Sequence, residues 1–217
     1  MIKRITMLAR RDDLSVADFA DYWYGQHADI VRGMPGLHRY LQNHILRVLT
    51  AGNGAEAFRV DGMPELWFLD EDAKNVAFAS PAAKALPEDE KNFLKGITIF
   101  GVEESVVLAG QGDVKVLVLR RSDDVPVPAE DALGWCRDLL QAVPAARACI
   151  LNRVLTSEHR PGVWHEQDPP DLIVEFRFES AEVAAEAIGR ESFQTFLGAQ
   201  PDGMTVAAYL IEVRTII

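Results

Sequence analysis

The sequence repeats one pattern of predicted elements twice, and this repeat constrains the fold more than any other feature. A strand is followed by an amphipathic helix, two strands, a second helical region and a closing strand, first over residues 1–109 and again over residues 114–217. The short glycine-rich segment Ala109–Asp113 joins the two halves. Each half therefore predicts a βαββαβ unit of the ferredoxin-like type, which places the chain in the α+β class.

Landmark residues support the repeat because they recur in the same order in both halves. The matched segments are Met34–Leu37 with Val143–Ala146, Asn43–Leu46 with Asn152–Leu155, and Pro64–Phe68 with Pro170–Val174. Such matching argues against a chance similarity between two unrelated α+β domains. A βαββαβ unit carries helices on one face of its sheet only, so its other face needs cover. We expect the second half to cover the first, sheet against sheet.

Composition and charge exclude several classes of function. The net charge is −11, which disfavours nucleic acid and anionic membranes as partners. No apolar run approaches the ~20 residues that a membrane-spanning helix needs. The start of the chain, Met1–Leu8, lacks the long apolar stretch of a signal peptide and is interpreted as the first strand of a cytoplasmic protein. Cys136 and Cys149 have no CxxC spacing, so we expect reduced, buried thiols.

The first predicted helix carries a histidine on its apolar face. Ser15 is a good N-cap residue, and the apolar face then follows helical spacing through Val16, Phe19, Trp23, His27 and Ile30. Considered alone, a histidine in such a place is more often a hydrogen-bonded core residue than a catalyst.

The strand after this helix alternates between apolar and polar residues. Its apolar set is Leu37, Leu41 and Ile45, and its polar set is His38, Tyr40, Gln42 and His44. We expect the apolar set to pack under the helices and the polar set to face the space between the two sheets, where a ligand can bind. A solvent-exposed polar face is the alternative.

The matching strand of the second half has no imidazole, which suggests that this half is a structural partner. Its corresponding residues are Arg147, Cys149, Leu151 and Arg153. The two arginines either contribute to the shared interior or form salt bridges with acidic neighbours.

The first half resembles the EthD family. The resemblance rests on Asp13-Leu14-Ser15 leading to Phe19, Tyr22-Trp23 and His27, on Met34-Pro35-Gly36-Leu37-His38-Arg39-Tyr40, and on Asp89-Glu90-Lys91-Asn92-Phe93. It covers residues 1–108, whereas the second half matches in pattern only. The resemblance implies a dimeric α/β barrel, which the two tandem units would build within one chain. A homodimer of such tandem barrels is compatible with the sequence.

The resemblance also implies a site. Proteins of the muconolactone methylisomerase type share the histidine followed by Met-Pro-Gly-Leu-His-basic-Tyr, and there the histidine and the tyrosine are implicated in catalysis without metal or organic cofactor. Carried over by position, His27 and Tyr40 are the expected catalytic residues. An imidazole transfers protons near neutral pH, and a phenol stabilises a developing oxyanion.

Trp23, His38, His44 and Trp67 are the expected substrate-binding residues, although Trp67 is also a natural core residue. His159 and His165 share a loop, but their spacing matches no metal motif, so no metal site is expected.

The leading hypothesis is a cofactor-independent enzyme that acts on a small cyclic or aromatic oxygenated compound by acid–base chemistry, as an isomerase, a lyase or a related catabolic enzyme. The sequence has no GxGxxG, GxSxG, HExxH or phosphate-binding loop, which argues against dinucleotide, serine-hydrolase and zinc-hydrolase chemistry. The alternatives are a non-enzymatic small-molecule binding protein and an oxidoreductase, either cofactor-free with dioxygen or haem-dependent. In each case the expected partner is a small hydrophobic or aromatic molecule.

Overall fold

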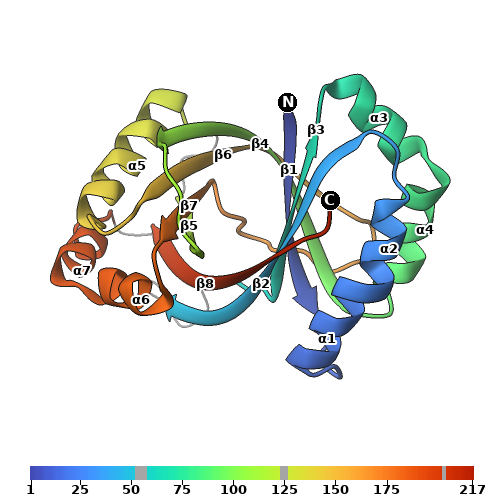
Figure 1. Ribbon diagram of the computed structural model, residues 1–217, viewed down its shortest axis with the longest axis horizontal. Coiled ribbons are helices and arrows are strands. Elements are labelled where there is room, and N and C mark those ends of the chain that lie inside the picture. Colours follow the sequence, from blue (N-terminus) through green and yellow to red (C-terminus); the bar gives the residue numbers. More distant parts are fainter. Residues whose placement is uncertain (52–57, 123–126, 202–203) are drawn as a thin grey trace.

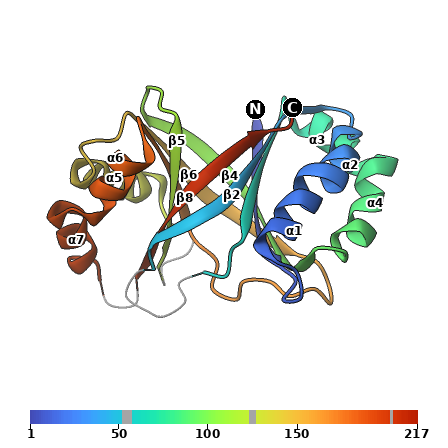
Figure 2. The same ribbon diagram turned by 60° about the horizontal axis from the view of Figure 1, so that its bottom comes forward.

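Eight strands form one closed barrel, with helices on two opposite flanks (Figures 1 and 2). The computed structural model describes residues 1–51, 58–122, 127–201 and 204–217. Among these residues, no helix combines the length and the apolar character needed to cross a membrane.

The elements of the two halves follow the same order. The first half contains β1 (Ile2–Arg10), α1 (Val16–Tyr22), the π-helix η1 (Trp23–His27), α2 (Ala28–Arg32), β2 (Leu37–Thr50), β3 (Gly62–Phe68), α3 (Glu71–Ala79), α4 (Pro81–Glu90) and β4 (Leu94–Leu108). The second half contains β5 (Val114–Arg121), α5 (Ala129–Ala142), β6 (Ala148–His159), β7 (Leu172–Phe178), α6 (Ala181–Gly189), α7 (Glu191–Gly198) and β8 (Thr205–Thr215).

The barrel closes because each half supplies the hydrogen-bonding partner for both edges of the other. The strand order is β1-β3-β2-β8-β5-β7-β6-β4, and all neighbours are antiparallel. The halves meet where β2 pairs with β8 and where β4 pairs with β6. Closure leaves no unpaired sheet edge. The predicted α/β barrel is therefore confirmed.

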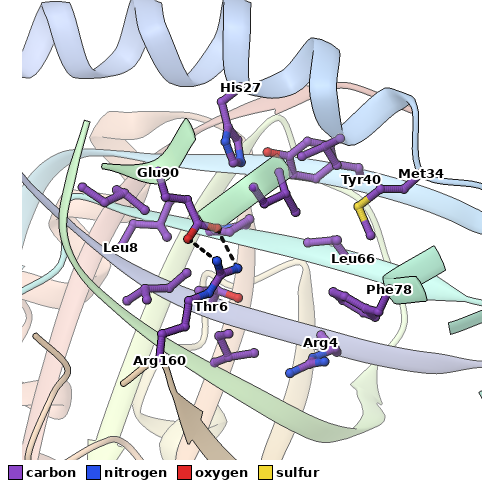
Figure 3. A pocket seen from close by; sticks show the side chains of 16 residues that line it. Arg4, Thr6, Leu8, His27, Met34, Tyr40, Leu66, Phe78, Glu90 and Arg160 are labelled. Atoms are coloured by element: carbon purple, nitrogen blue, oxygen red, sulfur yellow. Dashed lines mark hydrogen bonds and ion pairs between the residues drawn. The ribbon is translucent and has the colours of Figure 1, made fainter. Parts of the chain in front are cut away.

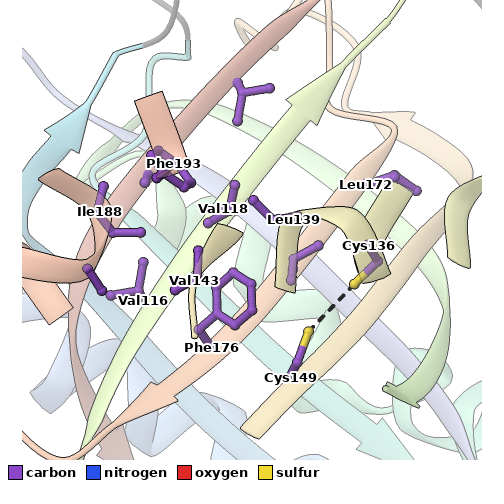
Figure 4. Close-up of a cluster of buried hydrophobic side chains, with 14 of the residues drawn as sticks. Val116, Val118, Cys136, Leu139, Val143, Cys149, Leu172, Phe176, Ile188 and Phe193 are labelled. Atoms are coloured by element: carbon purple, nitrogen blue, oxygen red, sulfur yellow. Dashed lines mark hydrogen bonds between the residues drawn. The ribbon is translucent and has the colours of Figure 1, made fainter. Parts of the chain in front are cut away.

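Each group of helices packs on the outer face of its own half of the sheet. In the second half, Val118 and Phe176 of the sheet meet Leu139 and Ile188 of the helices (Figure 4). Cys136 on α5 and Cys149 on β6 lie in this core, with their sulfur atoms 3.5 Å apart. Both thiols are free and buried, as the sequence predicts.

Side chains fill much of the barrel interior, and a cavity remains at the end where Lys3 and Glu65 lie. The apolar part of the interior contains Ile5, Met7, Met63, Phe100, Leu117 and Ile173. This filling agrees with the small interior of an eight-stranded barrel.

Toward one end, the interior holds a buried network of lysines and glutamates. The Nζ atom of Lys3 lies 2.8 Å from Glu65, and that of Lys115 lies 2.6 Å from Glu175. Lys115 also pairs with Glu65, which links the two halves. Burial alone would raise the pKa of Glu65, but the charges of Lys115 and Lys3 hold that pKa well below its usual range.

This network corrects one part of the sequence alignment between the halves. In the strand pairing, Glu65 lies opposite Ile5, and Glu175 lies opposite Leu117. Ile5 follows Lys3 by the same number of residues as Leu117 follows Lys115. Glu175 is thus the counterpart of Glu65, and the matching of Pro64–Phe68 with Pro170–Val174 is wrong by four residues. The prolines misled the alignment because they lie at different distances from the buried glutamate.

The prediction for the two faces of β2 is also wrong. Tyr40 packs with the helices, in a cluster with Ala28, Val31 and Met34, and Ile45 packs against the apolar cluster inside the barrel. The polar set was expected to face the barrel interior. The alternation of polar and apolar residues along β2 defines two faces of the strand, but it does not show which face meets the helices and which meets the interior. A shift in the pairing of β2 between Leu37 and Arg39 also lets Leu37 pack on the helix side together with Tyr40.

The apolar face of the first helix departs from the predicted spacing at η1. Val16 is exposed and Ile30 is only partly buried, whereas Ala28 and Val31 are buried. A π-helix turn contains more residues than an α-helix turn, so the buried face shifts after His27. The predicted N-cap is confirmed, because the Ser15 side chain accepts a hydrogen bond from the backbone N–H of Asp18.

The buried network generates a stability prediction. In Glu65→Gln, Lys3 and Lys115 lose their shared carboxylate, and we expect the free energy of unfolding to fall by about 3 kcal/mol. This loss is at the low end of the range for breaking a buried ion pair, because each lysine keeps another acidic partner. Lys3 keeps Glu104, and Lys115 keeps Glu175. The measurement is urea unfolding at pH 7.

A matched control is Glu179→Gln, which breaks an exposed pair with Arg147 and should change stability by less than about 0.5 kcal/mol. The pKa of Glu65 is depressed on folding, so its contribution is present above its ordinary pKa and is lost as the pH falls toward the folded value. The difference between wild type and Glu65→Gln should therefore shrink in acid. Equal destabilisation by the two substitutions at pH 7 would contradict the prediction.

Candidate functional site

A cavity lies between the first half of the sheet and its helices, outside the barrel interior (Figure 3). The centre of a water molecule can occupy about 70 Å³ of it, which suits a small ligand. Its walls are mainly apolar and include Leu8, Val31, Met34, Leu66, Leu86 and Ile97. Polar groups reach it from His27, Tyr40, Glu90 and Arg160.

His27 is held in this cavity by a carboxylate from another helix. It is the last residue of η1, and its Nδ1 atom lies 2.7 Å from Oδ2 of Asp89 on α4. The other oxygen of Asp89 accepts a hydrogen bond from the Tyr22 hydroxyl at 2.8 Å. Burial would raise the pKa of Asp89, but the hydrogen bonds from His27 and Tyr22 hold it below its usual range. Asp89 is therefore an anion at neutral pH.

The Asp89 carboxylate determines which ring nitrogen of His27 can act on a ligand. A carboxylate accepts hydrogen bonds, so Nδ1 carries a proton and, in the neutral form of the ring, Nε2 is the basic nitrogen. Within the part of the chain that the structure describes, Nε2 has no hydrogen-bond partner, and the His27 ring lines the cavity. His27 is thus oriented as a proton acceptor.

Tyr40 reaches the same cavity from β2. Figure 3 shows its hydroxyl on the side that faces His27. The hydroxyl oxygen accepts a hydrogen bond from Nε2 of Gln42 at 2.9 Å, and Gln42 is itself anchored to the backbone carbonyl of Trp23. Burial raises the pKa of Tyr40, so the hydroxyl keeps its proton. In the described residues no acceptor takes that proton, which leaves it available to a ligand.

Two charged residues, Glu90 and Arg160, close the end of the cavity opposite the helix of His27 (Figure 3). Nη2 of Arg160 donates a 2.9 Å hydrogen bond to Glu90, and Nη1 lies 2.8 Å from the other carboxylate oxygen. Burial raises the pKa of Glu90 to about 7; the nearby Asp89 also raises it, and Arg160 opposes both. Glu90 therefore exchanges its proton near neutral pH.

The four expected substrate-binding residues do not line this cavity. Trp23 is buried against Phe19 and the His44 ring, and burial together with Arg214 lowers the pKa of His44 to about 4, so His44 is neutral. His38 is exposed.

Trp67 lies at one end of the barrel, where Lys3 and Arg39 contact its ring. A separate cavity at that end includes Trp67 in its wall. Of the six expected site residues, the structure thus brings together His27 and Tyr40 alone in the first cavity.

The arginines of the second half follow the salt-bridge alternative. Arg147 pairs with Glu179, and Arg153 pairs with Glu103 at 2.7 Å. The rings of His159 and His165 lie 3.9 Å apart, but the described residues contain no group of three or more histidine, cysteine or acidic side chains that could hold a metal ion.

Sequence reasoning assigned no role to Asp89, Glu90 and Arg160. The first two belong to the acidic-Asn-Phe stretch that contributes to the family resemblance, and this was the available signal. Arg160 lies in the other half, and no spacing connects it to His27.

Comparisons with known proteins agree with this fold and add a family. The model of the EthD domain matches residues 11–96. The 4-carboxymethyl-4-methylbutenolide mutase of Pseudomonas reinekei is 30% identical over 113 residues, which are 49% of this chain and the whole of that protein.

Solved structures resemble the chain over almost its full length. An anthrone oxidase-like protein has a TM-score of 0.60 at 11% identity, covering 99% of this chain and 93% of that one. A putative monooxygenase from Fusobacterium nucleatum has a TM-score of 0.53 at 10% identity, with the same coverage. These likenesses show the fold. The match to the EthD model and the complete coverage of the mutase together show that this chain belongs to the EthD family.

Proposed function

We propose that the protein is an enzyme that moves a proton on a small oxygenated ring compound, with His27 as the acid–base group. The observation that carries this proposal is the 2.7 Å contact between Nδ1 of His27 and Asp89, beside a small apolar cavity. A fixed tautomer, a free Nε2 and a nearby phenol are the parts that proton transfer next to a carbonyl requires.

In the proposed reaction, Nε2 of His27 takes a proton from a ring carbon next to a carbonyl group. The electron pair of the broken C–H bond moves toward the carbonyl oxygen, and the Tyr40 hydroxyl donates a hydrogen bond to that oxygen. The imidazolium then returns the proton to a different carbon, which gives an isomer. Asp89 stabilises the positive charge on the ring during the intermediate stage. Protons and electrons balance with side chains alone.

The relative supports a lactone as the substrate class. The name of the Pseudomonas reinekei protein describes a mutase acting on a butenolide, which is an unsaturated lactone. The cavity is small and mainly apolar, and this suits a single ring. We therefore propose unsaturated lactones and related cyclic carbonyl compounds as substrates.

We also propose that the two halves are diverged copies of one ferredoxin-like unit. Lys3 with Glu65 and Lys115 with Glu175 occupy equivalent positions in the strand pairing. The amides of Asn43 and Asn152 likewise donate to backbone carbonyls of the neighbouring strand, those of Met63 and Ile173. By this equivalence Cys149 stands where the first copy has Tyr40, so the second copy lacks the site.

The proposed chemistry predicts the effect of two substitutions in the cavity. The test substrate is a butenolide whose double bond is one position removed from conjugation, so that the ring carbon next to the carbonyl group is a CH2. In deuterated water, wild-type protein should catalyse deuterium exchange at this carbon, followed over time by NMR. His27→Ala should slow the exchange about 10²–10⁴-fold, because the base is lost. Tyr40→Phe should slow it about tenfold, because one hydrogen bond to the oxyanion is lost and the ring remains.

Full exchange by a folded His27→Ala variant would refute the assignment. Consumption of dioxygen during turnover would point instead to an oxidoreductase, and tight binding without exchange would point to a binding protein.

Asp89 provides a second prediction. In Asp89→Asn, the amide can donate to Nδ1 and hold the proton on Nε2, which is the wrong tautomer for a base facing the cavity. We expect at least about 10²-fold slower exchange. The control is Tyr22→Phe, which removes the other hydrogen bond to Asp89 but leaves the carboxylate, and should cost less than about tenfold. Equal rates for the two variants, with matching thermal unfolding, would contradict the proposed role of Asp89.

A further inference from the structure

The end of β6 and the residue that follows it, Arg160, place charged side chains of the second half against residues that line the cavity of the first half. Glu158 accepts a 2.8 Å hydrogen bond from Arg4, and Arg160 pairs with Glu90. Arg4, Glu90 and Arg160 all line the cavity. Among the described residues, Arg160 is the sole contribution of the second half to this lining.

The pairing between Arg160 and Glu90 is a two-point contact with one poorly aligned side. Nη2 makes a hydrogen bond, but Nη1 is buried and has no aligned acceptor in the described part of the chain, although it lies 2.8 Å from Glu90. A guanidinium is built to bind a carboxylate through two parallel hydrogen bonds. Arg160 at the cavity wall can therefore form two well-aligned hydrogen bonds with another carboxylate if that carboxylate replaces Glu90.

Glu90 is a poor permanent partner for this arginine. Its pKa is about 7 because of burial and of the neighbouring Asp89, so near neutral pH it is partly uncharged, while arginine stays charged. Among the described residues, the other charged or titratable groups that line this space or pair with its residues are His27, Tyr40, Arg4, Asp89 and Glu158. An ordinary carboxylate with a lower pKa would stay ionised beside Arg160 and would be the better partner.

We propose that Arg160 binds an acidic substituent, a carboxylate, on the substrate ring and exchanges Glu90 for it. The second half then determines specificity at a reaction site that the first half builds. This inference rests on the proposed function, because it takes the cavity beside His27 as the substrate site. The chain carries a net charge of −11, so an anionic substrate needs a dedicated cation such as this one to be held.

The test measures binding of two probes by calorimetry at pH 7.5: 4-carboxymethyl-4-methylbutenolide and its methyl ester. Wild-type protein should prefer the acid. Arg160→Gln should weaken binding of the acid about 10- to 100-fold, the usual effect of losing a charged hydrogen-bonding partner, and should change binding of the ester less than about twofold. The matched control is Arg147→Gln, which removes the same charge from an exposed pair and should change neither.

Three outcomes would overturn the proposal. The Arg160→Gln variant keeps the affinity of wild type for the acid, or it loses affinity for both probes equally, which indicates a structural role only. Failure of wild-type protein to bind the acid would overturn it as well.

The Glu90→Gln variant provides an independent test of the exchange between Glu90 and the substrate carboxylate. Removing the competing carboxylate should tighten binding of the acid at pH 8. In wild type the same affinity should rise as the pH falls from 8 to 6, because Glu90 takes up a proton and releases Arg160. The variant should lack this part of the pH dependence, and since His27, Asp89, Arg4 and Glu158 are present in both proteins, the difference isolates Glu90. Identical pH profiles would contradict the exchange.

The experiments distinguish a failure of the proposed proton-transfer chemistry from a failure of the proposed role of Arg160. His27→Ala should keep the preference for acid over ester, because His27 is not the carboxylate partner. If that variant retains full exchange activity while Arg160→Gln still loses the acid, the proposed chemistry fails and the role of Arg160 stands. If His27→Ala is inactive and Arg160→Gln binds the acid normally, the reverse holds.

Discussion

The carboxylate of Glu65, buried between Lys3 and Lys115, is the interaction on which the arrangement of the whole chain depends. It joins the two halves inside the barrel, where apolar side chains surround the network. Burying such charges is costly unless each one is paired, so this region tolerates little change. The candidate site lies elsewhere, between a sheet and its own helices.

The candidate site occupies that layer and draws on elements far apart in sequence. His27 comes from the π-helix, Asp89 from the end of α4 and Tyr40 from β2. The π-helix matters here because it changes which residues face the sheet just where His27 must meet Asp89. The closed barrel then carries the end of β6 across β4, which places Arg160 beside Glu90. Barrel closure thus completes the cavity outside the barrel interior.

The barrel could be predicted from sequence, whereas the environment of the site could not. The order of elements in each half and the need to cover a bare sheet face were enough for the architecture. The alternation of Tyr40 and Leu41 showed two faces of β2, but which face meets the helices depends on the other seven strands and on a shift near Leu37. The family motif pointed to His27 and Tyr40. Asp89 is 62 residues from His27 and Arg160 is 70 from Glu90, so only the folded chain brings these pairs together.

The layer between sheet and helices differs in the second half. Cys149 lies in this layer, which is packed with Cys136, Val143, Phe176 and Phe178. Aromatic and aliphatic side chains in that layer stabilise the half by burial, whereas a cavity lined by ionisable groups would destabilise it. A homodimer of identical units must carry the same side chains in both layers. A tandem chain can use one layer for stability and the other for binding, and it can supply an arginine from the stable half to the half that binds.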